Sequence, residues 1–261
     1  RRALLKAVEL TLAQTNHEPA VVAMLEEFSA RHPADPSLDF AQLTLGEMRV
    51  KEFHGLAAGT NGPAQTNLLA AALTNLTFVL TRHTNSPFVK WAHYQRGWCH
   101  WHQDRFAEAA VDFSEAARRL PQAEEQAIAR FKLGEAQMRL KDYTNAIQSF
   151  GRVVTDYAGF ERVRTTYFDQ ALYQQLSAAT AVTNLVVAED AVRKLLEWFP
   201  DSFFSDRALL RFGSELNRMD KPADARAKFQ LLLDRFPKSA LAPQVHLAIA
   251  STFRQEFDFT N

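Results

Sequence analysis

The sequence predicts an all-α fold, a right-handed superhelix built from about six and a half helix-turn-helix repeats. The 261 residues include only 9 Gly and 10 Pro, and so few Gly disfavour the positive-φ turns of β-hairpin proteins. Apolar residues recur with the 3.6-residue period of helices rather than alternating as in strands. In addition, one series of small and aromatic residues recurs along the chain at fixed spacing.

The recurring series starts at a glycine and ends at a proline. From Gly97, an alanine follows at Ala109, a phenylalanine at Phe113 and a helix-ending proline at Pro121. We expect Gly97 to lie where two helices cross, because its missing side chain allows the second helix to approach closely. In the other repeats the starting place is taken by Gly46, Gly134, Leu176 and Gly213.

This register divides residues 1–261 into seven segments of one solenoid, the last of them partial. The segments span residues 1–33, 39–84, 90–121, 127–158, 167–200, 206–237 and 243–261. Each complete segment is expected to hold two helices joined by a short polar turn, such as residues 103–106. The second segment is longer, and its Gly-rich residues 55–66 predict an irregular insert before a helix over 67–82. Because the chain opens at Arg1 and ends at Asn261 within the helical pattern, we expect it to be a piece of a longer protein.

Composition argues against several classes of protein. Lys and Arg number 30, and Asp and Glu also number 30, whereas a dedicated nucleic-acid binder needs a basic surplus. The single cysteine, Cys99, excludes an intrachain disulfide. Apolar runs fall short of the roughly 20 residues that a membrane-spanning helix needs.

The best copy of the series occupies residues 129–150. It holds a Leu-Gly pair at 133–134, an Asp-Tyr turn at 142–143, then Ala146 and Phe150. This pattern resembles the tetratricopeptide repeat (TPR) family over nearly the whole chain, although the first and fourth copies lack the starting Gly and the family's first-helix Trp is absent. The resemblance implies a concave face formed by the first helices, and a non-catalytic scaffold that binds a protein or peptide there.

The connections between repeats are longer than is usual in this family. Residues 199–202 read Phe-Pro-Asp-Ser and residues 236–239 read Phe-Pro-Lys-Ser. Such connections resemble those of a bacterial envelope subgroup, which includes the Tol-Pal coordinator and the outer-membrane assembly lipoprotein. The resemblance therefore favours a periplasmic or envelope-associated setting.

An aromatic stripe marks the first helix of the third segment. Trp91, Tyr94, Trp98 and Trp101 are spaced 3, 4 and 3 residues apart and so share one helical face. They predict either a platform in the groove, for apolar side chains of a peptide or for a sugar ring, or a packing stripe against neighbouring helices. Other repeats carry apolar residues at the place of Tyr94 but mostly polar ones at those of Trp98 and Trp101. We therefore expect Trp98 and Trp101 to line a ligand groove.

The first helices of the later segments carry polar residues at groove positions. The candidates for binding a peptide of acidic character are Arg207, Arg211, Asn217 and Arg218. The alternative is a solvated face without a ligand.

The sequence predicts no catalytic residues, metal site or cofactor. His93, His100 and His102 lie close to Cys99 in the sequence, but no carboxylate completes a ligand set at the spacing that a helix requires. Cys99 has no motif around it and takes a place that other repeats fill with Ala. The leading hypothesis is thus a non-catalytic interaction scaffold. The alternatives are a glycan- or cell-wall-binding module that uses the stripe, and a helical arm of a larger enzyme.

Overall fold

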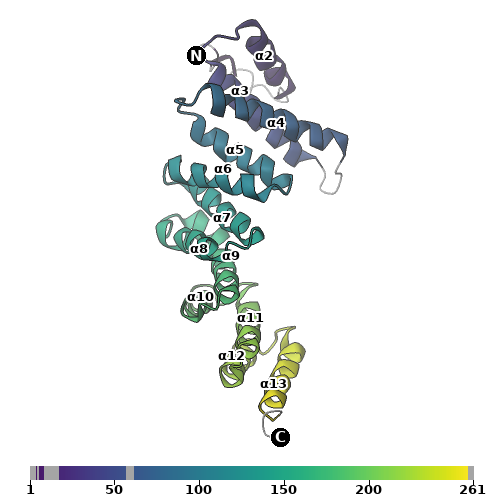
Figure 1. Cartoon of the computed structure of the whole chain (residues 1–261), viewed down its shortest axis with the longest axis vertical. Coiled ribbons are helices and arrows are strands. Elements are labelled where there is room, and N and C mark those ends of the chain that lie inside the picture. The colour runs from purple at the N-terminus through teal and green to yellow at the C-terminus, as the bar shows by residue number, and fades with distance from the viewer. Residues whose placement is uncertain (1–3, 5, 9–17, 57–61, 258–261) are drawn as a thin grey trace. The chain divides into compact units, whose positions relative to one another are not determined.

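The computed structural model describes residues 4, 6–8, 18–56 and 62–257, and every regular element in that part of the chain is a helix. The chain forms two compact units, Arg1–Pro121 and Gln122–Asn261, and Figure 1 shows the helices of each in order. The first unit contains α2 (Glu18–Arg31), α3 (Leu38–Gly55), α4 (Pro63–Arg82), α5 (Val89–His102) and α6 (Phe106–Arg119). The second contains α7 (Glu124–Arg139), α8 (Tyr143–Asp156), α9 (Glu161–Ala181), α10 (Leu185–Trp198), α11 (Ser205–Arg218), α12 (Pro222–Arg235) and α13 (Ala242–Phe257).

Within each unit, consecutive helices pack as antiparallel pairs, and the first helices of neighbouring pairs also touch. In the first unit α3 packs on α4, α5 packs on α6, and α3 contacts α5; in the second unit α7 contacts α9, and α9 contacts α11. The prediction of an all-α fold made of helix-turn-helix repeats is therefore confirmed. Each pair buries its apolar faces against its neighbours, as a solenoid requires.

The predicted helix crossing is observed at the expected glycines. A Cβ atom placed on Gly97 would lie 2.9 Å from the ring of Phe113, and one on Gly134 would lie 2.8 Å from the ring of Phe150. Both phenylalanines are fully buried. In these two pairs the glycine thus makes room for the aromatic ring that fills the centre.

Each first helix from α5 to α11 ends in the same turn, which the scarcity of Gly did not lead us to expect. The second residue after the helix has a left-handed backbone although it is not glycine, with φ between 55° and 61° at Asp104, Lys141, Thr183 and Asp220. The next backbone N–H reaches back to a carbonyl five residues earlier, as from Arg105 to His100 at 3.0 Å. This is the Schellman end of a helix, which normally uses Gly.

The predicted insert is shorter than the sequence indicated. Helix α3 continues to Gly55 and α4 begins at Pro63, so the expectation of an irregular segment over the whole of 55–66 is wrong at both ends. Pro63 opens α4 with Gly62 at the N-cap, a position at which the missing N–H of proline costs nothing. Residues 57–61 of the insert lie outside the described residues.

The serine of each connection has a structural role. Ser202 donates its hydroxyl to a carboxylate oxygen of Asp169 at 2.8 Å, and Ser239 does the same to Asp206 at 2.6 Å. The same hydroxyl oxygen accepts a backbone N–H two residues later, as from Phe204 to Ser202 at 3.1 Å. These bonds tie a first helix to the connection that follows its repeat, and they account for the serine in the Phe-Pro-x-Ser pattern.

Candidate functional site

The aromatic side chains of α5 form a connected row. The ring centroids of Trp91 and Tyr94 lie 6.3 Å apart, and those of Tyr94 and Trp98 lie 6.4 Å apart. Both pairs meet edge to face, at 90° and 85°, because the positive edge of one ring is attracted to the negative face of the next. All three residues are half-buried, so the row is held by packing and remains partly open to solvent.

Trp101 does not continue the row. Its ring meets that of Phe106 at the start of α6, with centroids 5.3 Å apart. Trp98 instead stacks on His102 at 5.9 Å and 24°, and touches Phe113 edge to face at 5.7 Å. Trp98 is thus anchored within the row, whereas Trp101 contacts the beginning of the next helix.

The row lies beside α3, and the two helices meet through faces in matching register. The α3–α5 face comprises Leu43, Glu47, Val50 and His54 of α3, and Trp91, Gln95, Trp98 and His102 of α5. Within each set the spacing is 4, 3 and 4 residues, which keeps the side chains on one side of a helix.

Two contacts define how the α3–α5 face is assembled. The Nε2 atoms of His54 and His102 lie 2.8 Å apart, and the ring of His54 meets that of Trp98 edge to face at 6.2 Å. The aromatic row of α5 therefore borders an imidazole pair that the sequence did not place beside it.

Glu47 is the unusual acid of this surface. Burial raises the pKa of its carboxyl to about 7, and the polar side chain of Gln95 offsets only part of that effect. No charged neighbour among the described residues contributes to this pKa. Burial makes an ionised carboxylate costly, and this is why the pKa of Glu47 lies above its ordinary value.

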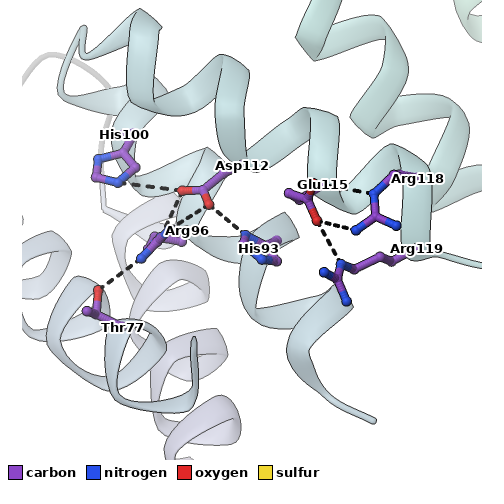
Figure 2. A network of polar contacts seen from close by, with 8 residues as sticks. All are labelled: Thr77, His93, Arg96, His100, Asp112, Glu115, Arg118 and Arg119. Carbon is purple, nitrogen blue, oxygen red and sulfur yellow. Dashed lines mark hydrogen bonds and ion pairs between the residues drawn. The ribbon is translucent and has the colours of Figure 1, made fainter. Parts of the chain in front are cut away.

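A second polar cluster, which sequence reasoning missed, lies between α5 and α6. Figure 2 shows His93, Arg96 and His100 directed at Asp112, which is 1% exposed. His93 donates from Nδ1 to Asp112 at 2.8 Å, Arg96 donates two hydrogen bonds at 2.8 Å each, and His100 Nε2 lies 3.6 Å away. Burial alone would raise the pKa of Asp112, but the bonds from His93 and Arg96 outweigh it and hold the pKa below its ordinary value.

The sequence holds a partial signal of this Asp112 cluster. Residues 93, 96 and 100 share one side of a helix, and Asp112 directly precedes the packing residue Phe113. With its carboxylate oxygens already occupied, Asp112 braces the helix pair. Among the described residues, no three His, Cys, Asp or Glu side chains gather as possible metal ligands. Cys99 is buried, which raises the pKa of its thiol to about 12.

Two cavities lie at equivalent places on the side of the second helices. The first has a volume of about 400 Å³ and is lined by Leu73, Thr77, Arg96, His100, Arg105, Glu108, Val111 and Asp112. The second, of about 300 Å³, lies in the second unit and is lined by Leu185, Glu189, Phe212, Leu216, Asp224, Ala227 and Lys228. In the second cavity Leu216 stands where the first has His100, and a Lys228–Glu189 ion pair of 2.6 Å crosses between α12 and α10.

The polar candidates on α11 divide into two kinds. Arg207 lies 3.5 Å from the ring centroid of Phe203 and bonds to that residue's carbonyl, and Arg218 pairs with Glu215 at 2.7 Å. Arg211 Nε and Asn217 Oδ1, by contrast, are buried atoms without a hydrogen-bond partner among the described residues.

Comparison with known proteins agrees with the repeat structure. Two family models, both described as tetratricopeptide repeat, match residues 64–124 and 128–159. No curated protein matches the chain. No helix of the described part combines the length and the hydropathy that spanning a membrane requires.

Solved structures share the fold at low sequence identity. The chain is similar to YrrB, titled a TPR protein with an unusual peptide-binding site, at 15% identity and a TM-score of 0.57; the match covers 85% of this chain and 97% of YrrB. It is also similar to MamA from Desulfovibrio magneticus RS-1, at 16% identity and a TM-score of 0.49, over 74% of this chain and 97% of that one. The matched repeat models and the helical fold together support the tetratricopeptide repeat family for this chain.

Proposed function

We propose that this chain is a non-catalytic scaffold that binds a peptide or protein partner on its first helices, with the α3–α5 face as the principal site. The row of Trp91, Tyr94 and Trp98 is the observation that carries the proposal, since large aromatic groups left partly open dominate the energetics of many interfaces. TPR proteins in general act as interaction scaffolds, and the similar protein YrrB is described as having a peptide-binding site.

The shape of the row favours a peptide over a glycan. A sugar ring stacks on flat aromatic surfaces, whereas successive rings of the row stand at 90° and 85° to one another. The notches between perpendicular rings suit branched or extended side chains of a peptide. The glycan-binding alternative is therefore disfavoured.

Selection from a random peptide library tests the proposal. The purified chain should enrich peptides that lose at least about tenfold in affinity when Trp98→Ala or Trp91→Ala is introduced. Trp198→Ala is the matched control, because Trp198 lies on α10, is 46% exposed and is outside the row. Peptides that bind all three variants equally would contradict the proposal.

Arg211 supports a second binding point within the other unit, for an acidic group of a partner, because its buried Nε has no hydrogen-bond partner among the described residues. A carboxylate would pair with the Arg211 guanidinium. Arg211→Gln should weaken binding of selected acidic peptides, whereas Arg218→Gln, whose arginine already pairs with Glu215, should not. Equal effects of the two variants would count against this point.

We further propose an envelope-associated setting, which the long Phe-Pro-x-Ser connections support through their resemblance to that subgroup. Fractionation of cells that express the full-length protein tests it, since recovery in the cytosol alone would refute it.

A further inference from the structure

We propose that His54 and His102 form a binding site for a divalent transition-metal ion, Cu²⁺ or Ni²⁺, coordinated by the Nε2 atoms of both imidazoles. The inference goes beyond the proposed function and does not depend on it, because it concerns a metal ion rather than a peptide. The sequence predicted no metal site, since the two histidines are 48 residues apart and meet only where α3 packs beside α5.

The separation of the two nitrogen atoms carries the proposal. The Nε2 atoms of His54 and His102 lie 2.8 Å apart. Bonds from a metal ion to histidine nitrogen are about 2.0–2.1 Å long, so two nitrogens at a right angle around one ion lie about 2.9 Å apart, and two at a tetrahedral angle about 3.3 Å apart. The observed distance therefore suits neighbouring positions of a square-planar or tetragonal ion, which is the geometry of Cu²⁺ and Ni²⁺.

The same distance allows a hydrogen bond between the two rings, and a bound metal ion would replace that bond. Both histidines are exposed, so a small rotation of each ring would turn both Nε2 lone pairs toward one ion on the solvent side. The ring that carries its proton on Nε2 would take the Nδ1 tautomer instead. Both rings then bind as neutral imidazoles, and no net proton is released.

Aromatic neighbours hold both imidazoles in place. The ring centroid of His102 lies 4.7 Å from that of Phe53 and 5.9 Å from that of Trp98. The ring of His54 is flanked by the same two side chains, at 5.6 Å and 6.2 Å. Rings that are already positioned lose little conformational freedom when they coordinate an ion. The pair is therefore a better set of ligands than two freely moving surface histidines would be.

The two imidazoles would fill two positions of the ion and leave the others open. Among the described residues no third His, Cys, Asp or Glu joins them as a ligand, so water can occupy the remaining positions. His93 and His100, the other histidines of α5, are directed at Asp112 instead. The site is thus confined to the end of the α3–α5 face, where its open positions admit a further ligand.

Calorimetric titration of the untagged whole chain with copper(II), nickel(II) and magnesium chlorides tests the site. Cu²⁺ and Ni²⁺ should bind, whereas Mg²⁺, which prefers oxygen ligands, should not. His54→Gln and His102→Gln should each weaken Cu²⁺ binding by at least about tenfold, since even the outer partners of a metal site contribute that much. His32→Gln is the matched control, because His32 is an exposed histidine of the same unit, and it should bind Cu²⁺ as the wild type does.

Electron paramagnetic resonance of the Cu²⁺-loaded wild type gives a second readout, which does not depend on how well a variant folds. The spectrum should show coupling of the copper electron to two imidazole nitrogens, and circular dichroism should show that both variants keep their helices. A wild-type spectrum without imidazole coupling would overturn the site. Equal Cu²⁺ affinity of the wild type, His54→Gln and His102→Gln would also overturn it, as would equal weakening by His32→Gln.

Discussion

The Nε2 atoms of His54 on α3 and His102 on α5 lie 2.8 Å apart, a distance at which one imidazole donates the hydrogen bond and the other accepts it. At least one of the two rings must therefore carry no proton on its Nε2 atom, and that ring is neutral. Burial lowers the pKa of His54, which also favours the neutral form. The pair thus links two first helices in a way that acid weakens.

Replacing His54 should make the first unit less sensitive to acid. The pKa of His54 in the folded protein is below that of an unfolded histidine, about 6.5. The contribution of His54 to folding stability is therefore fully present above about pH 6.5, and it is lost as the pH falls through the folded pKa. Glu47 has the opposite sign, since its raised pKa favours folding as the pH falls. Glu47 is present in both proteins, so the difference in pH dependence of stability between the His54 variant and the wild type reports on His54.

Thermal unfolding followed by tryptophan fluorescence measures this effect, since three of the 4 Trp lie on α5. Between about pH 7 and pH 5 the midpoint of His54→Gln should fall less than that of the wild type. His246→Gln, in the exposed part of α13, should behave as the wild type does. An identical pH dependence of His54→Gln and wild type would contradict the role given to the pair.

Asp112→Asn should destabilise the first unit by about 3 kcal/mol, because it removes the charge that the buried cluster of His93 and Arg96 requires. Glu115→Gln on the same helix should cost at most about 1 kcal/mol, although ion pairs with Arg118 and Arg119 lower the pKa of Glu115 to about 2. The two acids differ in burial, since the Asp112 side chain is 1% exposed and that of Glu115 is 31% exposed. Urea denaturation of both variants checks the contrast, and equal losses would refute it.

Gly134→Ala should destabilise the second unit by about 1–3 kcal/mol, because the new methyl group would lie 2.8 Å from the ring of Phe150. This effect opposes the usual gain of up to about 1 kcal/mol when Ala replaces Gly in a helix. Gly55→Ala, where the added Cβ meets nothing within 4 Å, should be neutral or stabilising. Circular dichroism at increasing urea measures both, and a stabilised Gly134→Ala would show that the helix crossing is misassigned.

Thr183→Asn should stabilise the second unit by about 1 kcal/mol. Thr183 has φ 57° in the turn between α9 and α10, where a β-branched side chain is strained and asparagine is tolerated. The hydrogen bond from Asn184 N–H to the Ala179 carbonyl, at 2.8 Å, should be retained. A lower thermal midpoint for Thr183→Asn would indicate that the threonine side chain contributes more than its backbone costs.

The fold was predictable because its determinants repeat along the chain. Gly97 and Phe113 are separated by the same distance in sequence as Gly134 and Phe150 and as Gly213 and Phe229, so one register describes these three helix crossings. The aromatic row was also predictable from spacing alone, although the turn of Trp101 toward Phe106 was not, because a side chain's direction depends on what packs beside it.

The partners of the row could not be predicted, because they come from the preceding repeat. The lengthened second segment obscures the match between His54 and His102, and only the packing of α3 on α5 brings them together. The Asp112 cluster was missed for a related reason. Its residues lie on two helices, and the rotation of each about its axis decides which side chains meet.

The most direct test of the scaffold account is to map where a selected peptide contacts the chain. Backbone amide NMR spectra, recorded with and without the peptide, would locate the perturbed residues. The account predicts the largest changes within residues 43–54 and 91–102, which form the α3–α5 face, with smaller changes for Trp98→Ala at the same peptide concentration. Changes confined to α4 and α6, on the side of the second helices, would contradict it.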